Sequence, residues 1–311
     1  MALKNINDIS KFQQFDNMEL IAKEVVEGFI AGLHRSPFHG FSAEFSEHRF
    51  YNPGESTKNI DWKLFARSDK LFVKQYEEET NLRCQVVIDN SSSMLFPYSK
   101  GNQFLINKLA FSVYSTAALI YILNRQRDAV GLTLFSEDID YHIGASLMPV
   151  HIDMLYNYLN GIIQPEAYRL KRHTNTINVI HTIAESIAKR SFVVIFSDIA
   201  ESAGLDNLFE SLQHLRYNKH EVLLYHVTDH KMEKNFDFSS RPHRFVDLET
   251  GAVAKLLPQE IKRNYKSTQD AFYAELNTRC AMCDINMVEA NIHDNFDKVL
   301  ISFLLKRKKL L

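Results

Sequence analysis

A mostly apolar run that ends in an acidic, serine-rich turn is the feature that most constrains this chain. Cys84-Gln85-Val86-Val87-Ile88 has the length and β-branched content of a buried strand, and Asp89-Asn90-Ser91-Ser92-Ser93 follows it directly. The turn therefore lies at the carboxyl end of a strand. In open α/β sheets this edge is where ligands bind. The sequence predicts an α/β fold with polar side chains gathered at that edge.

The spacing of the turn residues has a physical consequence. Residues at i, i+2 and i+4 of an extended turn point the same way, so Asp89, Ser91 and Ser93 can converge while Asn90 and Ser92 face elsewhere. Carboxylate and hydroxyl oxygens are ligands that hard cations such as Mg²⁺ accept. The alternative is that the serines cap the following helix, since serine is favoured at helix amino termini. Further ligands are needed to decide between the two.

Two further oxygen ligands are expected on other loops. Residues 191–198 are predicted to form a second buried strand that ends in the carboxylate of Asp198. Thr174 lies on the loop before a segment with apolar residues at helical spacing. A strand-terminal aspartate is also common as a turn residue, and a loop threonine is usually solvated. Their order along the chain, after Asp89, Ser91 and Ser93, favours a shared site.

The remaining pattern alternates strands with helices, which predicts a mainly parallel sheet with helices on both faces. An acidic turn at residues 136–138 joins two of the strands as a pair. A hairpin is expected over residues 245–254, with its turn at Thr250-Gly251. Helices are predicted over residues 17–33, 103–124, 150–160, 178–189, 205–217, 258–280 and 296–306, and the other strands over 129–135, 139–143, 221–228 and 285–289.

Asp89, Ser91 and Ser93, then Thr174, then Asp198 resemble the metal-ion-dependent adhesion site of von Willebrand factor type A domains. In those domains the ligands come from three loops in this order. The resemblance implies a Rossmann-like von Willebrand factor A-type fold, with an antiparallel strand at one edge of the sheet. It also implies bound Mg²⁺, or Mn²⁺ or Ca²⁺ in its place. Thr176 competes with Thr174 for the third-loop position.

The region before the first strand resembles the signature of a bacterial family long filed as a domain of unknown function. Its members usually accompany MoxR-type AAA+ ATPases. The resemblance implies an N-terminal helical and irregular extension over residues 1–80, packed on a von Willebrand factor A-like domain over residues 81–311. The matching segments are Arg49-Phe50-Tyr51-Asn52-Pro53-Gly54-Glu55, Ile60-Asp61-Trp62-Lys63, Ala66-Arg67 and Phe72-Val73-Lys74.

Composition excludes several classes of protein. Lys and Arg number 36 against 38 Asp and Glu, so no overall basic field exists to capture nucleic acid. The longest uncharged stretch, residues 109–123, is shorter than the about 20 residues needed to span a bilayer, so direct membrane insertion is not expected. The first 17 residues lack the apolar core of a signal peptide. With three cysteines and no even disulfide framework, a cytoplasmic location is expected.

The leading hypothesis is a cytoplasmic adaptor, not an enzyme, that docks onto another protein through a divalent cation. An acidic side chain of the partner would complete the coordination of the ion. By resemblance the partner is a MoxR-type AAA+ ATPase or a client protein that it remodels. The alternatives are a metal-dependent hydrolase or phosphatase that uses Asp89 as nucleophile, and a metal-free scaffold whose serines cap a helix. No phosphate-binding loop of the Gly-x-x-x-x-Gly-Lys-Ser/Thr type is present, so ATP use is assigned to a partner.

Overall fold

The chain forms two compact units, which are described separately. One unit combines Met1–Ala31 with Leu82–Leu311, and the other is Gly32–Asn81. Helix α2 (Met18–Leu33) belongs to the larger unit as far as Ala31, and the domain division expected at residue 80 stays a prediction. The computed structural model describes residues 17–33, 48–50, 67, 72–74, 82–98, 106–173, 176–199 and 205–310.

The smaller unit contains a two-stranded antiparallel ribbon. Strand β1 (His48–Phe50) pairs with β2 (Phe72–Lys74), and Arg49 lies opposite Val73. All of β2, and β1 from Arg49 onward, belong to the signature segments predicted from the sequence. Of the rest of that signature, only Arg67 is described, and the other residues, including Trp62, lie outside the described residues.

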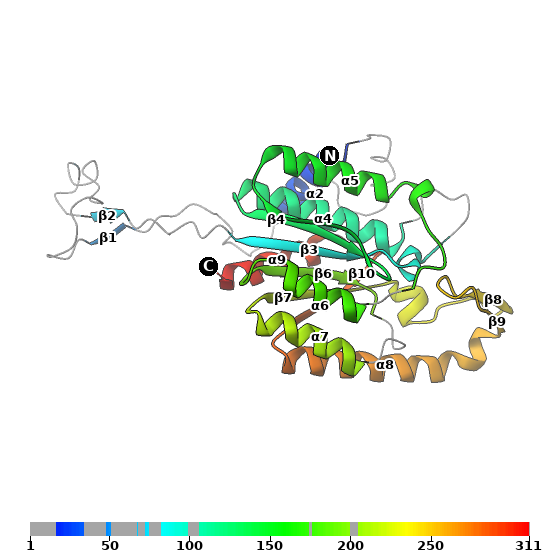
Figure 1. Cartoon of the computed structure of the whole chain (residues 1–311). Helices are drawn as coiled ribbons and strands as arrows, with labels where there is room; N and C mark the ends of the chain where they lie inside the picture. The colour runs from blue at the N-terminus through cyan, green and yellow to red at the C-terminus, as the bar shows by residue number, and fades with distance from the viewer. Residues whose placement is uncertain are drawn as a thin grey trace. The chain divides into compact units, whose positions relative to one another are not determined.

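The larger unit is built on a six-stranded sheet with the order β10-β7-β6-β3-β4-β5 (Figure 1). Every neighbouring pair is parallel except β4 and β5, which are antiparallel and place β5 at one edge. The predicted mainly parallel sheet with one antiparallel edge strand is confirmed. The strands are β3 (Arg83–Asp89), β4 (Ala129–Phe135), β5 (Ile139–Ser146), β6 (Phe192–Ser197), β7 (Glu221–Thr228) and β10 (Asn286–Asn291).

Helices cover both faces of this sheet, as the alternating sequence pattern predicts (Figure 1). Helices α4 (Lys108–Arg125), α5 (Pro149–Ile162) and α9 (Asp297–Leu310) lie with α2 over one face, and α6 (Thr176–Ser186), α7 (Leu205–Tyr217) and α8 (Pro258–Met282) lie over the other. The connections contain the 3₁₀ helices η3 (Ser92–Leu95) and η4 (Pro165–Ala167), the π-helix η6 (His230–Lys234), and a separate hairpin of β8 (His243–Val246) and β9 (Val253–Leu256).

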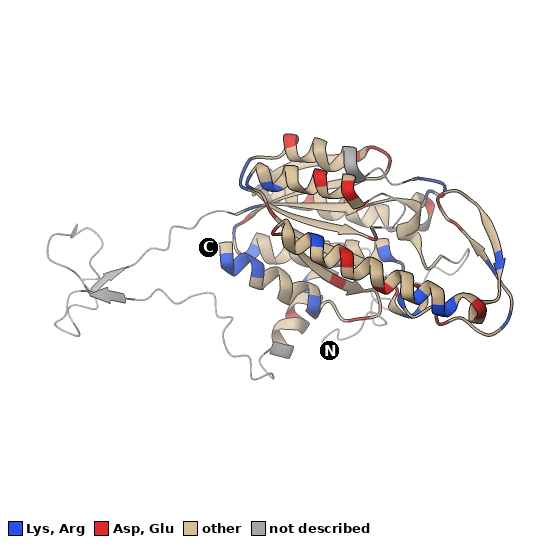
Figure 2. Cartoon of the chain, turned by 90° about the horizontal axis from the view of Figure 1, so that it is seen from below, with Lys and Arg blue, Asp and Glu red and all other residues tan. Residues whose placement is uncertain are grey.

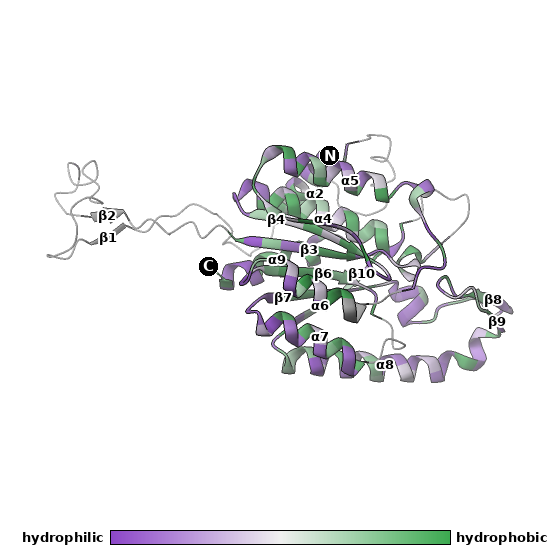
Figure 3. Cartoon of the chain, in the orientation of Figure 1, coloured by the Kyte–Doolittle hydropathy of each residue, from purple (hydrophilic) through white to green (hydrophobic). Residues whose placement is uncertain are grey.

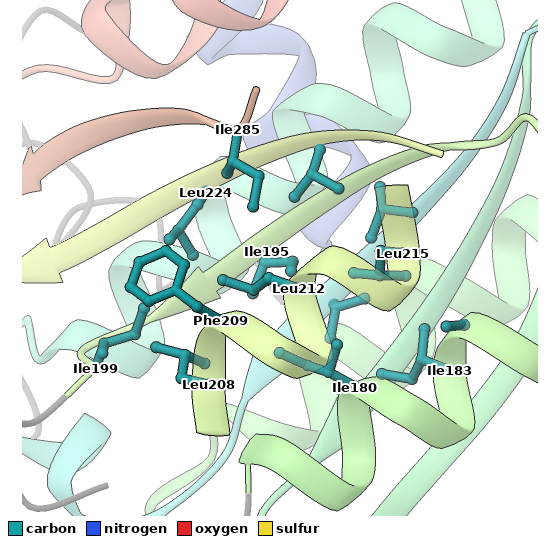
Figure 4. Close-up of a cluster of buried hydrophobic side chains, with 14 of the residues drawn as sticks. Ile180, Ile183, Ile195, Ile199, Leu208, Phe209, Leu212, Leu215, Leu224 and Ile285 are labelled. Carbon is teal, nitrogen blue, oxygen red and sulfur yellow. The ribbon is translucent and has the colours of Figure 1, made fainter. Parts of the chain in front are cut away.

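Alternate strand residues form the core on each face, because successive side chains of a strand point to opposite sides. Ile195 of β6 and Leu224 of β7 meet Leu212 of α7 within one buried cluster (Figure 4). Strands β3, β4 and β6 are almost entirely buried, and Figure 3 shows the central strands coloured as hydrophobic while polar residues gather on the outer helices. The core therefore fixes the register of the three strands whose ends carry the candidate site.

Helix α4 begins later than predicted. The sequence predicts a start at Gln103, whereas the helix starts at Lys108 because the Asn107 side chain accepts a hydrogen bond from Ala110 N at 2.8 Å. Most of α4 is buried, as expected for the long uncharged stretch. In the described part of the chain, no helix combines the length and apolar character needed to cross a bilayer.

The basic end of the chain is tied to the domain by ion pairs. Lys306 Nζ lies 2.9 Å from Glu221, and Arg307 contacts Asp128 at 2.7 Å. Asp128 is buried and also accepts a hydrogen bond from Leu82 N, where the chain enters β3. Two of the terminal cations thus help to hold α9 against the sheet and are not free to recruit an anionic partner.

Candidate metal centre

Asp89 ends β3 and is fully buried at the carboxyl edge of the sheet. One carboxylate oxygen accepts a hydrogen bond from Ser91 N at 2.9 Å, and the other accepts one from the Ser197 hydroxyl at 2.8 Å. Ser197 is the last residue of the neighbouring strand β6. The sequence predicts that Asp89 lies at this edge, but it does not single out Ser197, which reads only as part of a buried strand.

The hydroxyls of Ser91 and Ser93 lie 3.0 Å apart, as the i, i+2 spacing predicts. Ser91 precedes η3 without making a side-chain capping bond, and α4 is capped by Asn107. The interpretation of Ser91 as a hydroxyl cap is therefore wrong. The Ser91 hydroxyl instead contacts the Ser93 hydroxyl and lies beside the Asp89 carboxylate.

Asp198 lies next to these serines, because Ser93 makes a side-chain hydrogen bond to it. Burial, and after it the nearby Asp198 carboxylate, raise the pKa of Asp89 to about 7, although hydrogen bonds from Ser91 and Ser197 act in the opposite direction. Burial alone would also raise the pKa of Asp198, but the Lys108 ammonium holds it below its ordinary value. The two acids predicted on separate strands thus lie close enough to affect one another's ionisation.

A buried lysine occupies the same neighbourhood. Lys108 Nζ lies 2.7 Å from Asp198 Oδ2 and 2.6 Å from Glu233 Oε1, and its side chain is only 3% exposed. Lys108 is the first residue of α4, and Glu233 comes from the π-helix after β7. The ammonium also lies 5.7 Å from the centre of the Phe96 ring. The site therefore contains a cation of its own, held by two acids from separate loops.

The third predicted loop is described only up to His173. Thr174 lies outside the described residues, and of its competitor Thr176 only the backbone is described, at the start of α6. The preceding segment is held by Ser92, whose hydroxyl donates to Arg169 O at 3.1 Å and accepts from Arg172 N at 2.8 Å. Ser92 thus ties the first loop to the third, a role that its position between two candidate ligands does not reveal.

Two further elements hold residues 169–173. Arg172 forms an ion pair with Asp140 of β5, which also accepts a hydrogen bond from Asn90 Nδ2 at 3.2 Å. On the other side, Lys171 N donates to Leu248 O, at the tip of the β8–β9 hairpin, at 3.0 Å. The loop that leads to α6 is therefore fixed from both the edge strand and the hairpin.

This arrangement fits a hard divalent cation. Asp89, Ser91, Ser93 and Asp198 present carboxylate and hydroxyl oxygens, and burial together with the Asp198 carboxylate raises the pKa of Asp89. Among the described residues, no group of three or more His, Cys, Asp or Glu side chains could hold a metal. An ion at this edge would therefore rely on two carboxylates and neutral hydroxyls, as the sequence predicts. The Cys280 and Cys283 thiols are free.

Besides Ser92 and Ser197, sequence reasoning misses Lys108 and Glu233. A signal for Lys108 exists, because a lone cation stands directly before the uncharged stretch of α4. A charged residue at the start of a buried helix needs a buried partner. Glu233 has no comparable signal, since it lies in a mixed-charge segment, and its contact with Lys108 is made from a π-helix.

Comparison with known proteins identifies one family. The family model described as "Protein of unknown function DUF58" matches residues 47–274. The uncharacterized proteins Mb1516 of Mycobacterium bovis and Rv1480 of Mycobacterium tuberculosis are each 29% identical over 92 residues, which are 30% of this chain and 29% of theirs. The chain thus aligns with less than a third of the length of these relatives.

Solved structures show weaker likeness. The conserved hypothetical protein BatB from Bacteroides thetaiotaomicron gives a TM-score of 0.43 at 12% identity, covering 73% of this chain and 98% of that one. The PilB minor pilin from Streptococcus sanguinis gives a TM-score of 0.40 at 10% identity, covering 78% of this chain and 64% of that one.

Proposed function

Because the chain belongs to the DUF58 family of proteins of unknown function, its role must be argued from the site, and we propose a metal-dependent protein–protein interaction adaptor. The observation that carries this proposal is the meeting of Asp89, Ser91, Ser93 and Asp198 at one sheet edge. We take these four residues as ligands of a metal-ion-dependent adhesion site. Thr174, with Thr176 as the competing residue, is the proposed ligand from the third loop.

A von Willebrand factor A-type fold is part of this proposal. The strand order β10-β7-β6-β3-β4-β5, with only β5 antiparallel, supports it. Such a sheet brings the ends of β3 and β6 next to each other, because these strands pair directly. Two loops that leave neighbouring parallel strands at the same edge can diverge and form a crevice between them. A ligand in that crevice reaches the backbone and side chains of both loops.

The chain's own residues would leave the ion incompletely neutralised. Ser91 and Ser93 contribute no charge, and the Asp198 carboxylate is shared with Lys108. A bound divalent cation, Mg²⁺ or alternatively Mn²⁺ or Ca²⁺, supplies a Lewis-acidic position for an oxygen of the partner. We propose that this oxygen belongs to an acidic side chain. Ser92 and the segment that it holds would fix the rim against which the partner docks.

The proposed partner is a MoxR-type AAA+ ATPase or a client protein whose assembly, remodelling or maturation that ATPase drives. This part rests on the resemblance of the signature segments, and on the lack of a nucleotide-binding motif in the sequence. We propose a cytoplasmic location for the complex. Nucleic acid is not expected as a partner, because the chain carries no excess of basic residues.

A hydrolase or phosphatase that uses Asp89 is the alternative. That reaction requires a carboxylate oxygen free to attack phosphorus. Asp89 is buried, and both of its oxygens accept hydrogen bonds within the protein. This environment favours a ligand-positioning role over nucleophilic attack, so the adaptor is the preferred function.

The test measures cation binding and docking together. Calorimetric titration with MgCl₂ and MnCl₂, followed by pull-down of the purified AAA+ ATPase with and without EDTA, is performed on wild type, Asp89→Ala and Ser91→Ala. Ser211→Ala is the matched control, since Ser211 is equally buried but bonds only within α7. We expect EDTA and both site variants, but not the control, to abolish docking while the circular dichroism spectrum is preserved. Docking that survives in every case would refute the proposal.

A further inference from the structure

The β8–β9 hairpin presents one face that has no partner in the described part of the chain. Arg244 lies directly opposite Lys255, and Val246 lies directly opposite Val253. Since alternate residues of a strand share a face, these four side chains lie together on one side of the hairpin. Both valines are 48% exposed, and both cations are also exposed.

The opposite face anchors the hairpin to the domain. The Phe245 ring lies 5.0 Å from that of Phe238 and 5.8 Å from that of Phe236, and the Phe236 ring lies 4.5 Å from that of Tyr265 on α8. This aromatic cluster fixes which side of the hairpin faces outward. The face that carries Arg244, Val246, Val253 and Lys255 is therefore held in place and does not depend on a partner for its orientation.

The outward face conflicts with the rules for an isolated hairpin. Like charges directly opposite each other destabilise a strand pair, yet Arg244 and Lys255 occupy such positions. Neither side chain forms an ion pair or hydrogen bond with any described residue. Two uncompensated cations beside two exposed valines suit a ligand that brings negative charge and apolar surface together.

Strand β9 also offers backbone groups to a partner. It pairs only with β8 among the described strands, so one of its edges is free. A free edge can accept an additional extended segment, whose backbone bonds supply affinity while alternate side chains supply specificity. All four residues of β9 are exposed. The hairpin projects from the end of the unit where the parallel strands terminate (Figure 1), and Figure 2 shows Lys and Arg on the hairpin and on the adjoining end of α8.

We infer that this face binds an extended acidic and apolar segment of a partner protein. A carboxylate lies between Arg244 and Lys255, and aliphatic side chains cover Val246 and Val253. A second copy of the hairpin does not fit, because it would place the same cations against each other.

This inference is independent of the proposed ion site, although the two surfaces are structurally connected. The hairpin tip accepts a hydrogen bond from Lys171 N, and Glu249 lies 3.6 Å from His173 Nδ1. Both contacts are to the segment that Ser92 ties to the first loop. A partner on the hairpin therefore binds an element that helps to position the rim of the candidate site.

The experiment uses the full chain in EDTA, so that its result does not depend on a metal. Fluorescence anisotropy is measured with a labelled peptide of alternating acidic and valine residues, Asp-Val-Glu-Val-Asp-Val, and with versions in which lysine replaces the acids or serine replaces valine. Vesicles of phosphatidylcholine with phosphatidylserine, and single-stranded DNA, are the competing anionic probes.

Wild type should prefer the acidic valine peptide over all other probes. The double variant Arg244→Glu/Lys255→Glu should weaken that binding by at least about tenfold, because it replaces attraction by repulsion. Val246→Thr/Val253→Thr keeps β-branched side chains and should weaken it about three- to tenfold. The control Arg125→Glu/Lys219→Glu reverses as many exposed charges elsewhere. Equal binding by the control and hairpin variants, or a preference for vesicles or DNA, would overturn the inference.

Discussion

Replacing Lys108 by methionine tests the central feature of the site. The ammonium lies 2.7 Å from Asp198 and 2.6 Å from Glu233, with a side chain that is 3% exposed. At an effective dielectric constant of about 20, each pair is worth about 6 kcal/mol of gross Coulomb attraction. Most of this offsets the cost of burying the charges. Removing one partner of a buried pair nevertheless costs about 3 to 5 kcal/mol, because the Asp198 carboxylate would stay buried without compensation.

We expect Lys108→Met to lower the free energy of unfolding by about 3 to 5 kcal/mol at pH 7, measured by urea denaturation followed by circular dichroism. The loss should shrink as the pH falls, since protonation of Asp198 removes its unpaired charge. The variant Lys108→Met/Glu233→Gln should recover part of the loss, because it leaves only the Asp198 carboxylate without a counter-charge.

Lys234→Met is the matched control. Lys234 pairs with Glu289 at 2.5 Å in the same region, but their side chains are 28% and 24% exposed. A more solvated pair contributes less, so we expect a loss of about 1 kcal/mol or less. If Lys108→Met cost no more than this control, Lys108 would not act as the internal counter-charge of the site, and the electrostatic argument would fail.

Three other perturbations have defined outcomes. The pKa of Asp89 in the folded protein is raised to about 7, so wild type should lose stability relative to Asp89→Asn as the pH rises from about 4 to 7. The expected loss in the free energy of unfolding is up to about 1.4 kcal/mol per pH unit, which urea titrations across that range will measure. Ser92→Ala should cost about 1 to 3 kcal/mol and speed hydrogen exchange at the amide of Arg172, which loses its acceptor. Gly131→Ala should cost about 1 to 3 kcal/mol in thermal unfolding, since its Cβ would lie 2.2 Å from Gln85 Oε1 and 2.7 Å from two backbone atoms of β5.

The sequence predicts the sheet and its helices because their signals are local and mutually consistent. Helix α7 and strand β7 have the predicted bounds, and α2 begins where Asn17 accepts a hydrogen bond from Leu20 N at 3.1 Å. The antiparallel pairing of β4 and β5 follows from a short acidic turn, which cannot connect parallel strands, whereas the place of β5 at the edge of the sheet is implied by the family resemblance. Errors concentrate at ends, such as the start of α4, where one capping side chain decides the boundary.

The candidate site is predictable only in part, because some of its contacts join residues that lie far apart in the sequence. Asp89 and Asp198 each end a buried strand, so the sheet geometry alone brings them to one edge. The Lys108 pairs join residues separated by 90 and 125 positions, and they depend on how α4 and the π-helix are placed. No periodicity of apolar residues in the sequence predicts how these two elements are placed relative to one another. A sequence can therefore indicate the acids of a site more readily than the cation that balances them.

That balance has a consequence for the proposed adaptor. Lys108 neutralises part of the negative charge of the buried Asp198 and of the partly exposed Glu233. Ser197 and the Ser91 amide satisfy both oxygens of Asp89. The fold should consequently remain intact when divalent ions are removed, so a chelator should abolish docking without lowering the melting temperature. A large fall in the melting temperature in EDTA would instead make the ion a structural element and would contradict the division of roles between Lys108 and the metal.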